Sequence, residues 1–308
     1  MSSRADAPLR RHRAVARWGA ALIFVTVLLG AMVCATDSSS SCPAWPACYP
    51  DRLAPGLQVG WLENPVIEFV HRAISFAALV LLGWAGWLGR AHADARVRVL
   101  PWVALVCAVG SAVFGMMIIL FTLPWALGLL DLAFAIVALL LSTITAAALR
   151  PSARPGAAGA RTPATAAFGA LLVLHLMGSG IAGVTEDGTG SFTRCLSWPL
   201  WTVVDVDVDG AAGPQVARLA VAAVAALLVL WVAWTLWRGG ERLLAGVLVA
   251  ALVVEQALGL EIVTAGITAG QTNGIQATVA VAYSAVAVAL LGAVCVAVAR
   301  SLPGAAAR

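Results

Sequence analysis

The sequence contains no lysine and few charged residues of any kind. Only 11% of its 308 residues are charged, whereas 61% are hydrophobic, and the mean hydropathy is +0.94. Soluble globular domains carry about 25% charged and 45–50% apolar residues, so this composition excludes a chain that folds in water. We therefore expect the lipid bilayer to surround most of the chain.

Eight long apolar segments predict eight membrane-spanning helices. A spanning helix needs roughly 20 mostly apolar residues, and the segments that meet this requirement are approximately 18–36, 66–89, 99–121, 124–149, 164–185, 215–237, 243–265 and 275–299. An even number of spans places both termini on the same side. Residues 1–36 also resemble a cleaved signal peptide, with a basic start and an apolar centre, but the repeat described below gives this span a counterpart in the middle of the chain.

The arginines, which supply all 19 basic residues, are divided unequally between the two sides. Four fall on one side, namely Arg52, Arg72, Arg194 and Arg218, and fifteen fall on the other, namely Arg4, Arg10, Arg11, Arg13, Arg17, Arg90, Arg96, Arg98, Arg150, Arg154, Arg161, Arg238, Arg242, Arg300 and Arg308. Cytoplasmic loops carry the excess of basic residues. We therefore expect both termini in the cytoplasm. The net charge of +4 then follows from membrane orientation and does not indicate nucleic-acid binding.

A short motif occurs twice at an offset of 153 residues. It reads Cys42-Pro43-Ala44-Trp45-Pro46-Ala47-Cys48 in the first predicted outer loop and Cys195-Leu196-Ser197-Trp198-Pro199-Leu200-Trp201 in the third. Each copy precedes a span that opens with an arginine. We therefore predict an all-α polytopic membrane protein of two parallel four-helix repeats. The repeats are residues 18–150 and 164–300, with a Pro- and Gly-rich linker at 151–163 and tails at 1–17 and 301–308.

The cysteines on the predicted outer side meet an oxidising environment. Cys42 and Cys48 are expected to form a disulfide, with two free thiols as the alternative. Cys195 lacks the equivalent partner, so it is either a free thiol or the partner of Cys34. The two cysteines within spans, Cys107 and Cys295, are expected to be small apolar packing residues.

Ionisable side chains inside the predicted spans are the first candidates for function, because they are costly in lipid. Glu68 and His71 are three residues apart and so share one helix face, and Asp131 lies at about the same depth in the fourth span. These three residues would surround one site near the outer surface. A neutral imidazole is a natural axial ligand for haem iron, and a nearby carboxylate can orient it or transfer protons. The alternative is a Glu-His pair that, with Arg72, only anchors the helix.

The second half contains three further ionisable candidates. Glu255 and Glu261 are about 120° apart around their helix, so they cannot share one narrow face. His175 lies near the bilayer centre and is expected either to pack through a hydrogen bond to a neighbouring helix or to act as a ligand. His12 and His92 are expected to be solvated among cytoplasmic charges.

The first Cys motif, followed by Glu68-Phe69-Val70-His71-Arg72 at the start of the second span, resembles the haem A synthase family of cytochrome oxidase assembly proteins. The resemblance extends over essentially the whole chain. It implies eight spans in two four-helix repeats, with a disulfide in the first outer loop. It also implies that the first half binds haem O and the second a haem b, each between two histidines. The reaction is oxidation of the haem C8 methyl to a formyl group, with the Glu carboxylate implicated in catalysis.

Carried over residue by residue, the resemblance assigns catalysis to Glu68 and cofactor binding to His71 and Arg72, with His71 as the haem-iron ligand. Asp131 stands where the family has its fourth-span histidine, and it is assigned the role of a proton acceptor. The second half departs from the family, because no histidine occurs after His175. A bis-histidine haem is therefore excluded there, and the resemblance implies one haem, of b or O type, in the first half.

The function that the resemblance implies is haem O oxidation in haem A biosynthesis and cytochrome oxidase assembly. The expected partners are haem O and the lipid bilayer, with haem O synthase and cytochrome oxidase as further candidates. Two alternatives keep the scaffold without the reaction: a haem-binding or haem-delivering assembly factor, and a partner subunit without haem. Transport along the repeat interface is disfavoured, because the two halves show no broken helices with Gly and Pro in corresponding positions.

Overall fold

The computed structural model describes residues 6–121, 125–150, 155–181, 198–199, 212–265 and 275–303, most of which are helical. The elements are α1 (Asp6–Ala35), α2 (Pro65–Gly89), α3 (Ala95–Arg98), α4 (Leu100–Leu120), α5 (Trp125–Ala148), the 3-10 helix η1 (Pro155–Ala160), α6 (Arg161–Ile181), α8 (Ala212–Arg238), α9 (Arg242–Thr264) and α10 (Ile275–Ser301). This part of the chain contains no strand, and eight of its helices are long and apolar enough to cross a membrane. The predicted all-α membrane fold is therefore confirmed.

The helices agree with the predicted spans to within a few residues, with three additions. Helix α1 begins at Asp6, so part of the arginine-rich N-terminal segment is helical. Helix α3 has no counterpart among the predicted spans. Asp94 caps its N-terminus, because the Asp94 carboxylate accepts a hydrogen bond from the Arg96 backbone N–H at 2.8 Å and pairs with the Arg96 guanidinium at 2.6 Å. Within the predicted linker, residues 155–160 form η1 and α6 begins at Arg161.

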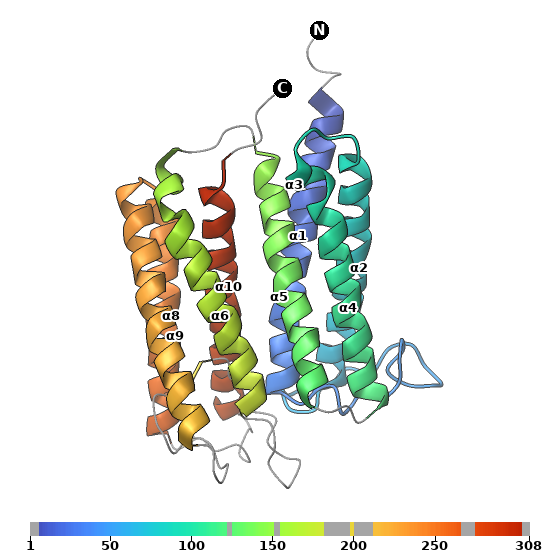
Figure 1. Ribbon diagram of the computed structural model, residues 1–308. Coiled ribbons are helices and arrows are strands. Elements are labelled where there is room, and N and C mark those ends of the chain that lie inside the picture. Colours follow the sequence, from blue (N-terminus) through green and yellow to red (C-terminus); the bar gives the residue numbers. More distant parts are fainter. Residues whose placement is uncertain are drawn as a thin grey trace.

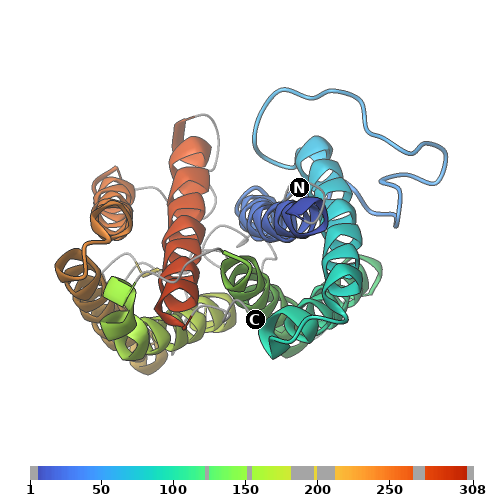
Figure 2. The same cartoon turned by 90° about the horizontal axis from the view of Figure 1, so that it is seen from above.

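The long helices form two groups of four that lie side by side (Figures 1 and 2). The first quartet is α1, α2, α4 and α5, and the second is α6, α8, α9 and α10. In each quartet, helices consecutive in the chain are neighbours and the fourth also packs against the first, so the second and fourth helices are diagonal. Between the quartets, α10 packs against α1 and α5, and α5 packs against α6. The shared order of neighbours agrees with the predicted duplication, and the symmetry that relates the halves stays a prediction.

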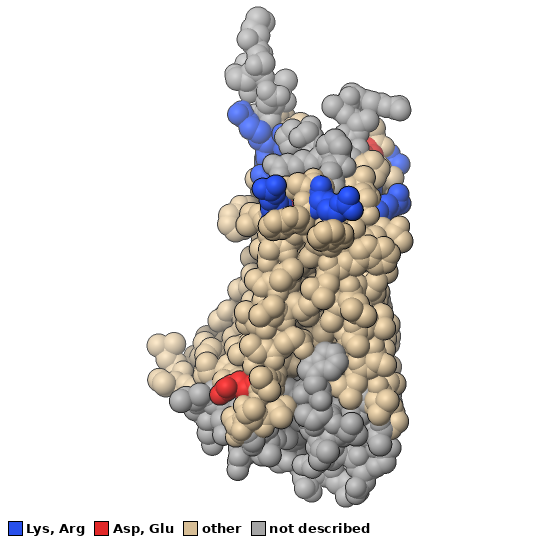
Figure 3. Space-filling view, turned by 90° about the vertical axis from the view of Figure 1, so that its left-hand side faces the viewer, with Lys and Arg blue, Asp and Glu red and all other residues tan. Residues whose placement is uncertain are grey.

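The two ends of the bundle differ in charge. We call the end where α1 begins and α10 ends the arginine end, because it gathers arginines that include Arg90, Arg96, Arg98, Arg238, Arg242 and Arg300 (Figure 3). Several of these guanidinium groups lie over tryptophan rings, at 4.1 Å for Arg90 over Trp87 and 5.7 Å for Arg242 over Trp237. The opposite end, which holds the segment between α1 and α2, is called the loop end. This charge asymmetry agrees with the expected orientation, which itself stays a prediction.

The second quartet is packed more completely than the first. In an 18-residue window of each span, 11–28% of the residues are buried in the first four spans and 33–67% in the last four. The third helices of the quartets show the difference along their length. Buried residues of α9 run from Leu244 to Ile262, whereas those of α4 are Pro101, Ala104 and Cys107, all near the arginine end. No residue of α4 from 108 to 120, and none of α5 from 127 to 135, is buried. The interior of the first quartet is therefore less densely packed in its loop-end half.

Candidate functional site

The segment before α2 is closed on itself by a disulfide and is joined to α2 by a helix cap. Cys42 and Cys48 form the predicted disulfide. The side chain of Asn64 accepts a hydrogen bond from the Val66 backbone N–H at 2.9 Å, which caps the N-terminus of α2. The same side chain donates to the Gly60 carbonyl at 2.7 Å. These contacts fix where α2 begins and therefore how deep its first ionisable residues lie.

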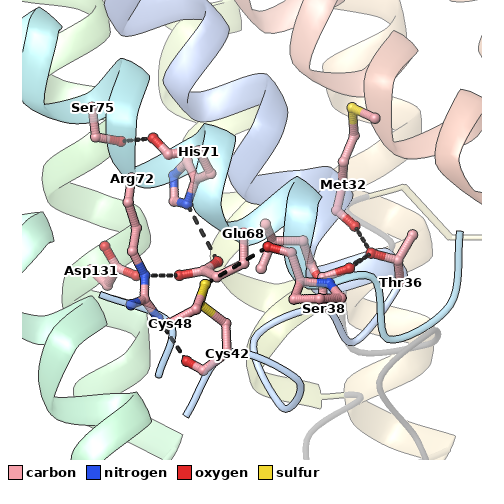
Figure 4. A network of polar contacts seen from close by, with 12 residues as sticks. Met32, Thr36, Ser38, Cys42, Cys48, Glu68, His71, Arg72, Ser75 and Asp131 are labelled. Atoms are coloured by element: carbon pink, nitrogen blue, oxygen red, sulfur yellow. Dashed lines mark hydrogen bonds and ion pairs between the residues drawn. A yellow bond between two sulfur atoms is a disulfide. The ribbon is translucent and has the colours of Figure 1, made fainter. Parts of the chain in front are cut away.

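Arg72 connects the Cys motif to α2 (Figure 4). Its Nε donates to Glu68 Oε1 at 2.7 Å. Its Nη1 donates to the Ala44 carbonyl at 2.5 Å and its Nη2 to the Cys42 carbonyl at 2.8 Å. A planar guanidinium presents several donors in a fixed fork, and here the fork joins one carboxylate to the backbone of the disulfide loop. The alternative in which these residues anchor the helix thus describes Arg72 well, while its cofactor-binding role stays a prediction.

Glu68 and His71 face each other on α2, as their spacing predicts. Glu68 is buried, and its Oε2 lies 3.7 Å from Nδ1 of His71, which is longer than a hydrogen bond. Nδ1 of His71 has no hydrogen-bond partner among the described residues. On the other side of the ring, Nε2 lies next to Gly30 of α1, where an added Cβ would be 3.5 Å away. The ring is therefore placed beside α1, with a quarter of the side chain exposed.

Asp131 lies on α5, the helix diagonal to α2 in the same quartet. The Ser111 hydroxyl of α4 donates a hydrogen bond to its carboxylate, and an added Cβ on Gly115 of α4 would lie 3.6 Å from its Oδ2. Asp131 interacts electrostatically with both His71 and Glu68. The structure thus brings together the three residues that sequence analysis placed at one depth. Ser111 was missed, because a neutral hydroxyl costs less to bury in a span than an ionised group and therefore does not by itself indicate function.

This group offers one imidazole and two carboxylates. The described residues contain no cluster of three or more His, Cys, Asp or Glu side chains that would hold a bare metal ion. One imidazole nitrogen faces a carboxylate and the other faces a glycine, an arrangement suited to a single axial bond to a metal already held by a macrocycle. Asp131, supported by a hydroxyl, is suited to accept or donate a proton nearby.

The ionisable residues of the second quartet do not converge on one site. Nδ1 of buried His175 donates to the Leu171 carbonyl of its own helix at 2.7 Å, so the expected hydrogen bond to a neighbouring helix is wrong. Its Nε2 has no partner among the described residues. Glu255 is fully buried and both carboxylate oxygens lack partners in the same part of the chain, whereas Glu261 is exposed. The prediction that the two glutamates occupy different faces is confirmed.

The second copy of the motif enters the core of its quartet. Trp198 is fully buried within the main hydrophobic cluster, and its carbonyl accepts a hydrogen bond from Arg218 at 3.0 Å. The Tyr283 hydroxyl of α10 donates to the Pro199 carbonyl at 3.2 Å. In the first motif, the corresponding Trp45 is 47% exposed. Both motifs are therefore held by an arginine of the following helix, but only the second closes its quartet with a buried tryptophan.

The structure also tests what the sequence predicted for three further cysteines and two further histidines. Cys107 and Cys295 are free and buried, as expected. Cys34 is disulfide-bonded, and Cys195, the partner considered for it, lies outside the described residues. His12 is buried, with an added Cβ on Gly89 lying 3.3 Å from its Cε1, so its expected solvation is wrong. The cause is the early start of α1. His92 is half-buried, and its Nδ1 accepts the Asp94 backbone N–H at 3.1 Å.

Comparison with known proteins adds no relative. No protein-family model matches the chain, and no curated protein matches it. What this chain does must therefore be argued from the residues and geometry described above.

Proposed function

We propose that this chain is a divergent haem A synthase-like membrane protein whose first quartet binds one haem through His71. The resemblance of the first Cys motif and of the Glu68–Arg72 segment to that family supports the proposal. The single observation that carries it is the setting of the imidazole. Its Nδ1 faces a buried carboxylate without a hydrogen bond, and the residue of α1 beside its Nε2 is a glycine, which has no side chain.

The residues present fit a haem by three criteria. Haem-ligating histidines orient the ring by donating the second N–H to an acceptor. Glu68 Oε2 is 3.7 Å from Nδ1 of His71, so a small rotation of either side chain would form this hydrogen bond. Gly30 and Gly115 flank His71 and Asp131 without side chains of their own. The loop-end half of the quartet interior is also the less densely packed part of the bundle.

Each residue of the site would have a separate role in binding haem or in moving protons. Arg72 pairs with Glu68 beside the imidazole, so that Glu68 would accept a hydrogen bond from Nδ1–H and leave Nε2 as the ligating nitrogen. Asp131, steadied by Ser111, would accept a proton from the substrate. The bound haem would supply iron-centred oxidation chemistry. The proposed reaction is the oxidation of the C8 methyl of haem O to a formyl group, in which water supplies the oxygen atom and four electrons and four protons pass to an external electron acceptor.

The same proposal includes the orientation and the partners. Because basic residues favour the cytoplasmic side, the arginine end would face the cytoplasm of a bacterial cell and the site would lie near the outer surface. Haem O, a lipid-soluble porphyrin, would reach the site in the membrane. Haem O synthase and cytochrome oxidase would act before and after this protein.

A second candidate function is non-catalytic haem binding or haem delivery within the same assembly process. The observation that favours it is the second quartet, which has no histidine after His175 and is closed by Trp198 and Tyr283. A protein with one haem and no second haem to take up electrons is better suited to carrying a porphyrin than to oxidising it.

Replacing the proposed ligand tests haem binding directly. We expect His71→Ala protein to lose the Soret absorption that the wild-type protein shows after purification from haem O-producing cells. His92→Ala is the matched control, because it removes an imidazole at the arginine end and should leave the absorption unchanged. A colourless wild-type protein, or a Soret band of equal height in His71→Ala, would contradict the proposal.

Pigment extraction separates the two candidate functions. Cells that make haem O and express this chain should accumulate haem A if the chain oxidises its substrate, and Glu68→Gln should abolish that product. Cells in which the coloured protein carries only unmodified haem O or haem b would exclude the enzyme and support the carrier.

A further inference from the structure

The segment between the disulfide loop and α2 carries large apolar side chains with no packing partner. We call residues 53–62 the apolar loop. Within it, Leu57 is 97% exposed, Val59 is fully exposed and Leu53 is 70% exposed. The loop contains no charged residue, since Asp51, Arg52 and Glu63 lie just outside it. Contiguous apolar side chains left open in this way mark a contact surface.

The loop leaves the bundle sideways. Figures 1 and 2 show the segment between α1 and α2 extending laterally from the first quartet, level with the loop-end turns of the helices, before it returns to α2. A segment that projects sideways at this level meets the rim of the bilayer that surrounds the spans. Helix α2, to which the loop returns, also exposes a large apolar side chain, since Phe76 is 70% exposed.

Both ends of the loop are fixed to the protein. On the side of the disulfide, the Tyr49 hydroxyl donates to the Ser41 carbonyl at 3.1 Å. On the side of α2, Trp61 Nε1 donates to the Thr278 hydroxyl of α10 at 3.0 Å, and Asn64 holds the Gly60 carbonyl. The exposed tip is therefore held out from the bundle by specific contacts. Tyr49, which precedes the loop, and Trp61, near its end, are residue types that membrane interfaces favour.

From this placement we propose that the apolar loop is a membrane anchor, which inserts Leu53, Leu57 and Val59 into the lipid leaflet at the loop end. Interfacial segments bury apolar side chains at the boundary between headgroups and acyl chains, and the lack of charge in the loop suits that depth. The occupant of this surface is lipid, and the inference does not depend on haem binding. Anchoring would steady the disulfide loop that Arg72 holds against α2.

Photo-crosslinking of the full-length protein tests the anchor. Benzoyl-phenylalanine is placed at Leu57, or at Ser40 as an exposed polar control at the same end of the bundle. Each protein is reconstituted in nanodiscs of phosphatidylcholine and phosphatidylglycerol with tritium in the acyl chains. After irradiation, we expect at least fivefold more radiolabel on the Leu57 probe than on the Ser40 probe. Thermal unfolding of each labelled protein establishes that it is folded.

A second variant makes the test specific to insertion. In a protein with the probe at Leu53, the double change Leu57→Asp and Val59→Asp should lower lipid labelling to the Ser40 level, because carboxylates draw the loop out of the acyl region. Equal labelling of the Leu57 and Ser40 probes would overturn the proposal. So would crosslinking of the Leu57 probe to a protein instead of lipid in native membranes. Haem content plays no part in either result.

Discussion

Replacing Arg72 by alanine should destabilise the whole protein, because one side chain joins α2 to the disulfide loop. The guanidinium donates to Glu68 at 2.7 Å and to the carbonyls of Ala44, Cys42 and Ala47 at 2.5, 2.8 and 3.2 Å. Alanine removes all of these contacts and leaves the carboxylate without its cation.

The expected loss follows from how little of the pair is exposed. The Arg72 side chain is 12% exposed and the Glu68 side chain 5%. Removing one partner of a buried ion pair costs about 3–5 kcal/mol. The released carbonyls lie at the loop end and can be rehydrated, so we add nothing for them. At about 2–4 °C per kcal/mol, the unfolding temperature should fall by roughly 6–20 °C.

Unfolding can be followed through the free, buried Cys107 and Cys295, which react with a thiol-sensitive dye as the helices separate in detergent. Arg52→Ala is the matched control. That guanidinium lies 4.4 Å from the Tyr49 ring at the surface, a contact worth about 0.5–1 kcal/mol. Arg72→Lys should fall between the two, because an ammonium cannot span the carboxylate and the loop together. A shift for Arg72→Ala no larger than that for Arg52→Ala would refute the proposed role of Arg72 in joining α2 to the disulfide loop.

Thermal unfolding checks three further outcomes, followed by the thiol-sensitive dye for the first two and by circular dichroism for the acid titration, because thiols react only as thiolates. Trp198→Ala should cost about 3–5 kcal/mol by opening a cavity, whereas Trp45→Ala, at the half-exposed corresponding position, should change stability by less than about 1 kcal/mol; equal effects would contradict the different packing of the two motifs. The double change Cys42→Ser and Cys48→Ser opens a loop with a sequence separation of 6, which should cost about 2 kcal/mol; unchanged stability would count against a structural disulfide. The guanidinium beside Asp94 holds the pKa of that carboxyl below its ordinary 3.8, so its stabilisation is complete above pH 3.8 and is lost as the pH falls through the lower, folded-state value. The stability difference between wild type and Asp94→Asn should accordingly be constant near neutral pH and shrink in acid, and a difference that persists at pH 2 would be inconsistent with this pairing.

The spans could be predicted from sequence because bilayer thickness fixes the length of each apolar segment. The same criterion explains why the predicted first span begins later than the observed helix. Helix α1 continues to Asp6 through residues that are too polar to count toward a span. His12 lies in that continuation, so the pattern of apolar residues could not predict that its side chain is buried against α2. The spacing of Glu68 and His71 was sufficient to place both on one face, because helical geometry alone determines it.

The contacts that build the site were less accessible to sequence reasoning. Arg72 binds backbone carbonyls, and every residue has one, so no residue type identifies its partners. The two tryptophans of the repeated motif illustrate a second limit. Trp45 and Trp198 occupy corresponding positions, yet one is half-exposed and the other fully buried. Their environments depend on how completely the surrounding helices pack, which the motif does not encode.

The contrast between the quartets has a physical cause if the proposed function holds. A haem site must keep space between diagonal helices, and that space forgoes the stabilisation that packing would give. Where histidine ligands are absent, nothing maintains the space, and a buried tryptophan with a hydrogen-bonded tyrosine stabilises the fold instead. The second quartet has this arrangement, and its α10 packs against α1 and α5 of the first. The densely packed quartet can thus support the helices around His71, so the less densely packed interior that haem binding requires need not be stabilised by its own contacts alone.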